Sequence, residues 1–466
     1  MKEKSIRKKI IKIIKSKYFA FLLAFLLMFF TVKNINLLSD SGDASETWKV
    51  IKTFFSKNHY YSYVMYKGIY AFIPGVISLY ISKIIHVSEF CILNILNSFI
   101  FAYITVYGLP YLINYLFKNK KQSIIQVYLL IIFYYFLERS VYYFLSVDTI
   151  SCALFIIMTN SCIRNINNNF NKFLKLFYLG LLIGINLCLS GQFTISTYII
   201  LIYLIIVIIK NFKENIKKII QILLILFLGL FITKGINEFY MRSIVYPAKD
   251  SGVWLPSGQE WIKAGYSSNI LTINYPKSVP DYLSMNIVKS EDEKLLNKII
   301  EGQFVFDTPE YIKMIIKNPV RFIVRWSERL FLGMVNDPIN VYGKLFYNNT
   351  IILEIMLMLI YSFWNIFKKT FKKFSDLLSF KFFILVAVIF SALVPSFGHV
   401  ENRYYLLSRT VIIGSFFLSP TLNVIFKNLK SKKIISNSIN YNIINCLIFM
   451  LLGTIIYYAI YQSIGV

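Results

Sequence analysis

The stretch MKEKSIRKKIIKIIKSKYFAFLLAFLLMFF, residues 1–30, joins a cluster of basic residues to a long apolar run. A basic start followed by an apolar segment is typical of a secretory signal, but no small-residue cleavage site follows this one. We therefore expect a retained signal anchor that crosses a bilayer and leaves the basic N-terminus in the cytoplasm.

The composition beyond this first crossing predicts an integral membrane protein. Of the 466 residues, 57% are hydrophobic and 17% are aromatic, and the mean hydropathy is +0.59. These values exceed those of ordinary soluble domains. Apolar runs long enough to cross about 30 Å of hydrocarbon recur along almost the whole chain. We expect an all-α polytopic membrane protein.

The formal net charge of +27 does not point to nucleic acid, because the basic residues fall in short clusters between apolar runs rather than on one face. Short basic loops stay in the cytoplasm, so these clusters predict the topology. The clusters that follow the N-terminal one are Lys118, Lys120 and Lys121; Arg164, Lys172 and Lys175; Lys210, Lys213, Lys217 and Lys218; Lys368, Lys369, Lys372 and Lys373; and Lys427, Lys430, Lys432 and Lys433.

Placing all of these clusters inside predicts about eleven transmembrane helices, with the C-terminus outside. The segment Val64–Ile85 is apolar but contains Lys67 and Lys83. Counting it as a crossing would invert every later loop, so we expect it to lie on or partly within the outer leaflet. The expected crossings are 17–33, 90–117, 122–140, 145–163, 172–189, 192–210, 217–236, 348–367, 378–395, 403–426 and 440–462.

Three parts follow from this topology: an N-terminal transmembrane module, 1–236, with a first external loop at 34–89; an external loop subdomain of mixed structure, 237–347; and C-terminal transmembrane helices, 348–466. Within the second part, the segment 307–331 has a helix-start pattern and apolar residues at helical spacing. Its arginines recur every four residues on one face, which would bind lipid headgroups or face solvent. They are Arg321, Arg325 and Arg329.

An acidic motif, SDSGDASETW at 39–48, lies just outside the first expected crossing. Asp43 and Glu46 are three residues apart and would share a helix face, with Asp40 before them. A purely structural alternative exists, because such residues are good helix caps and favour a first turn. Their oxygens could also bind a divalent cation, although the spacing alone does not specify one.

A second motif, SFGHVENRYYLLSRT at 396–410, opens the tenth expected crossing. It holds His399, Glu401, Arg403 and Arg409 against apolar sequence. An arginine inside a crossing is costly unless it snorkels, lines a polar cavity or has an anionic partner. That partner is either Glu401, in an internal ion pair, or a phosphate, which arginine binds through two parallel hydrogen bonds.

Weaker candidates lie at other outer ends of the expected crossings. Glu138 and Arg139 would end the third and Asp148 would start the fourth, either shaping a cavity or forming an interfacial ion pair. Gln192, in LSGQFT, would either contact a sugar or have only a structural role in a loop.

Taken together, these features resemble the GT-C glycosyltransferases, in particular the protein O-mannosyltransferases and the aminoarabinose transferases. The resemblance rests on the acidic motif, the outer-leaflet segment, the large late external loop and the ENRYYL element, 401–406. It implies a GT-C-like fold and transfer of a sugar from a polyprenyl-phosphate donor on the outer face of the cell membrane, with inversion at the anomeric carbon.

The resemblance also implies roles for residues. Asp43 matches the catalytic base, with Asp40 and Glu46 beside it; because this chain has Asp-Ala where many members have Asp-Glu, the choice between Asp40 and Asp43 stays open. Arg403 matches the donor-phosphate contact, and His399, Glu401 and Arg409 lie near it in sequence. A carboxylate accepts the acceptor's proton, and cations stabilise the departing phosphate.

The implied partners are a polyprenyl-phosphate-linked sugar, membrane lipids and a cell-envelope glycan, glycolipid or protein as acceptor, with no nucleic acid. Some relatives use a divalent metal at the acidic motif, so the cofactor stays open. A polysaccharide polymerase or ligase is an alternative, as is a transporter or flippase of lipid-linked saccharides. A transporter would favour charges near the bilayer midplane and two related halves.

Overall fold

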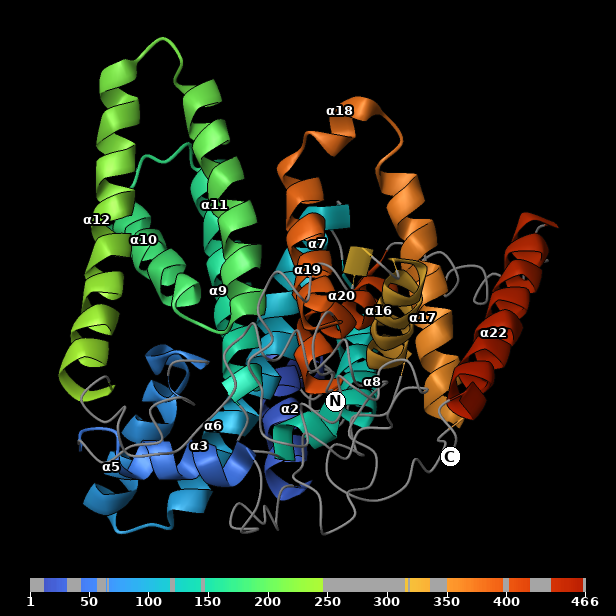
Figure 1. Ribbon diagram of the computed structural model, residues 1–466, viewed down its shortest axis with the longest axis horizontal. Coiled ribbons are helices and arrows are strands. Elements are labelled where there is room, and N and C mark those ends of the chain that lie inside the picture. Colours follow the sequence, from blue (N-terminus) through green and yellow to red (C-terminus); the bar gives the residue numbers. More distant parts are fainter. Residues whose placement is uncertain are drawn as a thin grey trace, which may run out of the picture. The chain divides into compact units, whose positions relative to one another are not determined.

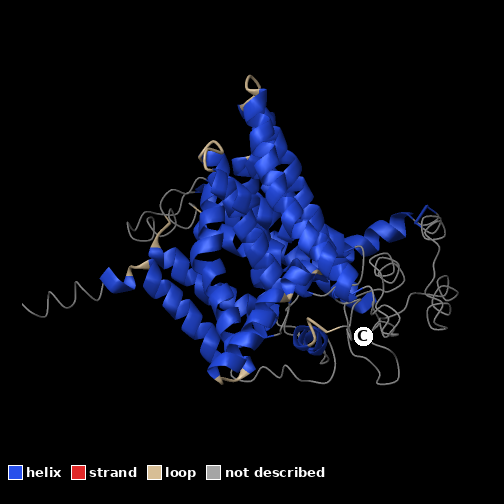
Figure 2. Cartoon of the chain, turned by 90° about the vertical axis from the view of Figure 1, so that its left-hand side faces the viewer, coloured by secondary structure: helices blue, strands red, loops and turns tan. Residues whose placement is uncertain are grey.

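The computed structural model describes residues 12–31, 43–56, 64, 67–117, 122–143, 147–245, 315–316, 319–335, 350–396, 402–419 and 437–463. All regular elements within these ranges are helical (Figures 1 and 2). Among the described residues, six helices are long and apolar enough to cross a bilayer. They are Glu89–Phe117, Val147–Asn167, Gly191–Asn211, Ile216–Ile244, Ile351–Thr370 and Ile443–Ile460. The fold is all-α and has the helices expected of a membrane protein.

Helices occupy each of the eleven ranges in which crossings were expected. Several of them are apolar but short: Lys17–Thr31, Phe173–Leu187, Phe380–Ser396 and Leu406–Leu418. The presence of six membrane-crossing candidates is therefore established for the described chain, whereas the full number of crossings stays a prediction.

The chain forms two compact units. Unit 1 comprises Met1–Trp254, Ile366–Ala387 and Ile413–Ser431. Unit 2 comprises Leu255–Asn365, Val388–Ile412 and Lys432–Val466.

Unit 1 is built mainly of consecutive helices joined by short turns, which makes sequence neighbours antiparallel. A π-helical turn, η2, continues α6 into α7, and only three to six residues separate most later helices. The helices are α2 (Lys17–Thr31), α6 (Glu89–Tyr103), η2 (Ile104–Gly108), α7 (Leu109–Phe117), α8 (Ile124–Tyr143), α9 (Val147–Asn167), α10 (Phe173–Leu187), α11 (Gly191–Asn211) and α12 (Ile216–Tyr240).

Basic segments far apart in sequence meet at one end of unit 1. The Arg164 guanidinium, near the end of α9, lies 5.0 Å from the centroid of the Tyr111 ring on α7. One turn further along α7, Tyr115 lies 5.2 Å from the ammonium of Lys381. Lys381 belongs to α19 (Phe380–Ser396), which follows the short helix α18 (Phe374–Leu377).

The turn between α11 and α12 lies at the same end. Lys218 Nζ donates to Asn171 Oδ1 of the α9–α10 turn at 3.4 Å, and Figure 1 shows α18 and the α11–α12 turn at the same end of the helices. We call this the basic end of unit 1. Three of the basic clusters that the topology rule placed on one side are thus together in space.

The opposite end of unit 1 carries α3 (Asp43–Lys52), the 3₁₀ turn η1 (Ile69–Ala71) and α5 (Ile73–Ile85), and Figure 1 shows α3 running across the bundle there. We call it the α3 end. With 13 residues, α5 is about 20 Å long and shorter than the hydrocarbon layer of about 30 Å. That length suits the expected interfacial segment, whose membrane placement stays a prediction.

Helices α10 and α12 approach each other through small residues. A Cβ on Gly180 would clash with the backbone carbonyl of Leu226, and one on Gly229 would lie 2.5 Å from the carbonyl oxygen of Phe177. A Cβ on Gly184 would meet the Thr233 hydroxyl. Small residues at such contacts let two helix backbones pack closely, which is how helices associate in lipid.

Unit 2 contains α16 (Pro319–Val335), the 3₁₀ turn η7 (Asn402–Tyr405) and α22 (Asn437–Ser463), together with parts of α17 (Thr350–Thr370), α19 and α20 (Leu406–Leu418). The Ser391 and Ser408 hydroxyls, on α19 and α20, are 3.1 Å apart. Of the helix expected from Asp307, residues 315–316 and Pro319–Val335 are helical, and the other residues before Pro319 lie outside the described residues.

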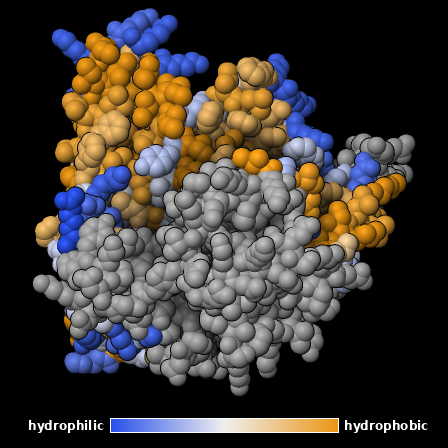
Figure 3. All heavy atoms as spheres, viewed as in Figure 1, coloured by the Kyte–Doolittle hydropathy of each residue, from blue (hydrophilic) through white to orange (hydrophobic). Residues whose placement is uncertain are grey.

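Large apolar side chains cover the outward faces of several helices. Figure 3 shows them over α12, with hydrophilic residues at the end formed by the α11–α12 turn. A hydrophobic surface of this extent is expected where a helix faces lipid rather than water. The exposed apolar residues of α12 include Ile216, Ile220, Leu224, Leu228, Phe231, Ile236 and Phe239.

Candidate functional site

A buried ion pair lies at the α3 end of unit 1. Lys67 Nζ is 3.5 Å from Asp148 Oδ1, and each side chain is only 2% exposed. Asp148 is the second residue of α9, and Lys67 immediately precedes the turn that leads to η1. Asp148 was a weak candidate from sequence, whereas Lys67 was not selected, although a lysine inside an apolar segment was the available signal.

The backbone of Gly68 fixes the position of Lys67. Its φ is +79°, and a Cβ there would overlap the carbonyl oxygen of Cys188 in the α10–α11 connection. The Tyr70 hydroxyl donates to the Thr233 carbonyl of α12. This segment is therefore held between α12 and the α10–α11 connection. Only glycine has free access to such a conformation at so close an approach.

Glu138 and Arg139, expected together, point to different surroundings. Glu138 is fully buried on α8, whereas the Arg139 guanidinium lies 5.8 Å from the centroid of the Tyr135 ring. Neighbouring residues on a helix do not face each other. One turn after Glu138, the Tyr142 hydroxyl lies 3.0 Å from that of Tyr134. The ionic partner of Asp148 is thus Lys67, whereas Glu138 and Arg139 lie in different surroundings.

Gln192, for which the sequence suggested either a sugar contact or a loop role, lies in the first turn of α11, where it is 6% exposed. The loop role is therefore wrong, and the sugar contact stays a prediction. Ser190 is the N-cap of that helix. The serine and glycine before Gln192 suggested a turn, and they begin the helix instead because such residues favour the N-terminal boundary.

The acidic motif begins α3. Asp40 lies outside the described residues, Asp43 is the first residue of the helix and Glu46 lies in its first turn. A helix forms at these positions, as the acidic motif suggested, and the shared face of Asp43 and Glu46 stays a prediction. Trp48 anchors α3: it is 3% exposed and its ring centroid lies 5.9 Å from that of Phe90.

The arginine motif lies in unit 2. His399 and Glu401 are outside the described residues, and Arg403 belongs to η7. Arg409, on α20, is completely buried, and its Nη1 donates to the Met334 carbonyl of α16 at 3.2 Å. The structure therefore excludes snorkelling of Arg409 to a surface.

Arg329 provides a second buried guanidinium against the same elements. It is 1% exposed, and the Tyr405 hydroxyl donates to its carbonyl oxygen at 3.5 Å. The expectation that Arg329 would face lipid headgroups or solvent is wrong. Gly333, one turn later, allows α16 to lie directly against the Tyr405 ring, so the packing of α16 on η7 draws Arg329 inward. We call Arg329, Arg409 and Tyr405 the arginine cluster.

The arginine cluster holds two permanent positive charges inside unit 2. Guanidinium groups keep their proton at any physiological pH and present several hydrogen-bond donors in a fixed plane. Their burial requires dipoles or negative groups as partners, since an uncompensated buried charge is very costly. Such donors suit carbonyl, carboxylate or phosphate oxygens.

No family model, curated protein or solved structure matches this chain.

Metal ligation gains no support from the described part of the chain. Within it, no three His, Cys, Asp or Glu side chains lie close enough together to hold a metal ion. The acidic motif stays untested, because Asp40 is outside the described residues and the side chains of Asp43 and Glu46 are not described.

Proposed function

We propose that this protein is a membrane glycosyltransferase with a GT-C-like fold, which transfers a sugar from a polyprenyl-phosphate donor to a cell-envelope acceptor. The observation that carries the proposal is the buried arginine cluster beside the ENRYYL motif. The cluster fixes η7 against α16, because the Tyr405 hydroxyl donates to the Arg329 carbonyl, and η7 carries Arg403, the proposed phosphate contact. Arginine suits that role because its planar guanidinium binds phosphate through two parallel hydrogen bonds.

The proposal places the basic end of unit 1 in the cytoplasm and the α3 end outside. The shared location of Arg164, Lys218 and Lys381 supports this orientation, since short basic loops remain on the cytoplasmic side. The acidic motif at the start of α3 then belongs to the outer face of the cell membrane.

In the proposed reaction, an acceptor hydroxyl oxygen bonds to the anomeric carbon of the donor sugar while the bond from that carbon to the phosphate oxygen breaks. Asp43 accepts the hydroxyl proton, with Asp40 as the alternative base. The electron pair of the broken bond leaves with the phosphate, whose charge Arg403 stabilises. Attack from the face opposite the phosphate inverts the configuration.

The test measures transfer of labelled sugar from polyprenyl-phosphate donors to membrane acceptors, at matched expression. Loss of a general base lowers the rate by about 100-fold or more, and loss of a phosphate contact does the same. We therefore expect Asp43→Asn and Arg403→Ala to lose activity to that degree. Glu214→Gln, an exposed carboxylate in the α11–α12 turn, serves as the matched control and should retain it.

Other outcomes would redirect the proposal. Loss in Asp40→Asn with activity retained in Asp43→Asn would move the base by three residues. Products longer than one added sugar would identify a polymerase. A wild-type protein that transfers nothing, but moves lipid-linked saccharide across proteoliposomes, would refute the transferase proposal and identify a transporter.

A further inference from the structure

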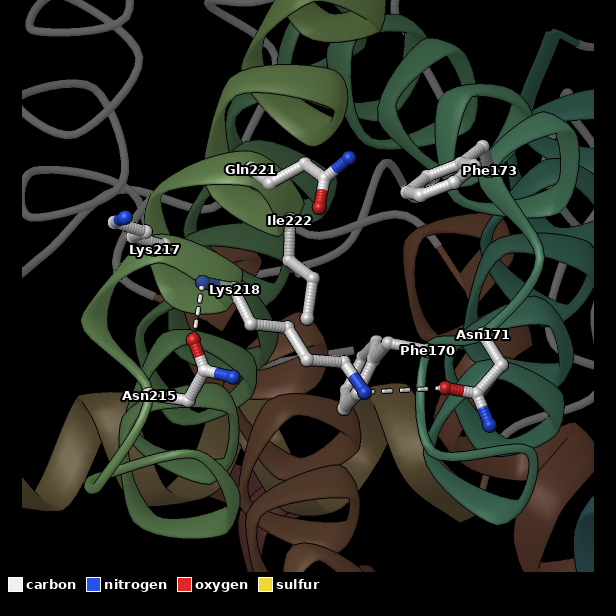
Figure 4. Close-up of a pocket in the computed structure, with 8 residues that line it drawn as sticks. All are labelled: Phe170, Asn171, Phe173, Asn215, Lys217, Lys218, Gln221 and Ile222. Atoms are coloured by element: carbon white, nitrogen blue, oxygen red, sulfur yellow. Dashed lines mark hydrogen bonds between the residues drawn. The ribbon is translucent and has the colours of Figure 1, made fainter.

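A cavity of about 460 Å³ opens at the basic end of unit 1, between the α9–α10 turn and the start of α12 (Figure 4). Lys217 and Lys218 line it with two cations, and Asn171 and Gln221 add amide groups. Phe170 and Phe173 form an apolar wall. None of these residues takes part in the proposed transfer reaction, so the cavity requires a separate explanation.

Hydrogen bonds hold both the backbone and the side chain of Lys218 in place. Its backbone N–H donates to the Asn215 side chain at 3.0 Å, which caps α12. Its ammonium donates to Asn171 Oδ1 at 3.4 Å and lies 4.4 Å from the centroid of the Phe212 ring. Figure 4 shows the side chain reaching from α12 to the opposite wall. An ammonium has three N–H donors, so the Asn171 contact leaves others for an anion.

The charge around the cavity is strongly one-sided. Between residues 164 and 221, the chain has seven basic residues and a single acidic one, Glu214, which does not line the cavity. Helices α10 and α12 also begin here, and helix N-termini carry partial positive charge. The cavity therefore favours an anion.

The rim of the cavity is apolar. Phe173 is 51% exposed and Leu174 is 81% exposed at the start of α10, and Ile216 and Ile220 on α12 are 64% and 51% exposed. A soluble anion gains nothing from such a rim. A phospholipid does, because its acyl chains can lie along these side chains while its phosphate reaches the lysines.

We propose that this cavity binds the phosphate headgroup of an anionic phospholipid from the leaflet at the basic end of unit 1. Lys218 and Lys217 contact the phosphate, Asn171 and Gln221 donate to headgroup oxygens, and the exposed Phe173 contacts the glycerol and upper acyl region. The inference is independent of the transferase proposal, since it concerns the opposite end of unit 1.

The test uses the purified full-length protein, delipidated in mild detergent and titrated with phosphatidylglycerol. Phosphatidylcholine with the same acyl chains and inorganic phosphate are titrated separately, and bound molecules are counted by native mass spectrometry. Each basic residue near a membrane surface contributes about fivefold to binding an anionic lipid. Lys217→Ala/Lys218→Ala should therefore bind phosphatidylglycerol about 30-fold more weakly, and Lys218→Arg should bind it as the wild type does.

Lys213→Ala is the matched control, because Lys213 is exposed in the same basic turn but does not line the cavity. Lys217→Glu, at an exposed position, provides a second variant that leaves the Lys218–Asn171 contact in place and should also bind more weakly. Equal loss in Lys213→Ala, or no loss in the double variant and in Lys217→Glu, would overturn the proposal. Inorganic phosphate binding as tightly as phosphatidylglycerol would overturn the lipid assignment.

Discussion

Lys67 and Asp148 bring opposite charges from segments 81 residues apart into a buried contact. Desolvating both groups costs free energy that their attraction offsets only in part, so the pair is not in itself a strong stabiliser. Removing one partner is different, because the other charge then remains buried without that counter-charge. The energetic role of the pair is therefore to hold the turn before η1 against α9 in one arrangement.

The residue-scale prediction concerns this pair. Lys67→Met should lower the free energy of unfolding by about 3–5 kcal/mol, because it leaves the Asp148 carboxylate buried without its cation. Lys67→Met/Asp148→Leu should recover much of that loss. Thermal unfolding in detergent gives the comparison, with Lys83→Met, an exposed lysine on α5, as the control. The single variant Asp148→Leu completes the comparison. If the double variant loses as much unfolding free energy as the two single variants added together, the two residues are not coupled.

At the scale of elements, the contact between α10 and α12 depends on the absence of side chains. Gly180 and Gly184 lie one turn apart on α10, and the backbone of α10 faces Gly229 of α12. Apolar burial does not drive helices together within lipid, since lipid tails are equally apolar. Close van der Waals packing at these glycines is what holds the two helices in contact.

The element-scale prediction follows from this packing. Gly229→Leu would force the helices apart, because even a Cβ there would lie 2.5 Å from the Phe177 carbonyl oxygen. We expect a loss of about 1–3 kcal/mol or more in stability. Gly235→Leu is the matched control on the same helix, where a Cβ would meet nothing within 4 Å. Resistance to proteolysis and thermal unfolding are the measurements, and equal behaviour of both variants would contradict the close-packed interface.

At the scale of the whole molecule, the two ends of unit 1 differ in chemistry. The basic end gathers Arg164, Lys218 and Lys381, whereas the α3 end holds the buried Lys67–Asp148 pair and the acidic motif. This asymmetry is what a positive-inside topology requires.

The whole-molecule prediction tests that topology with introduced cysteines. A membrane-impermeant maleimide should label Ser56→Cys, which follows α3, in intact cells, and should label Lys213→Cys only after permeabilisation. The wild-type protein, whose partly exposed native cysteines include Cys91, Cys188 and Cys446, gives the labelling background. Labelling of Lys213→Cys in intact cells would invert the assignment.

The sequence by itself determined the helices and the grouping of the basic clusters. The crossing expected at 217–236 is α12, Ile216–Tyr240, and that expected at 192–210 is α11, Gly191–Asn211. The helices follow from local hydropathy, because an apolar run in lipid must hydrogen-bond its own backbone N–H and C=O groups, which a helix does. The grouping of the basic clusters follows from the lysines and arginines of the short loops.

Only the tertiary structure decided which polar residues are buried and with what. The four-residue spacing placed Arg329 on a helix face but could not show that Tyr405 and Gly333 draw that face inward. The pairing of Lys67 with Asp148 and the cavity between Asn171 and Lys218 likewise join separate helices. Burial and ionic pairing depend on contacts between segments distant in sequence, and a single local pattern is compatible with several such arrangements.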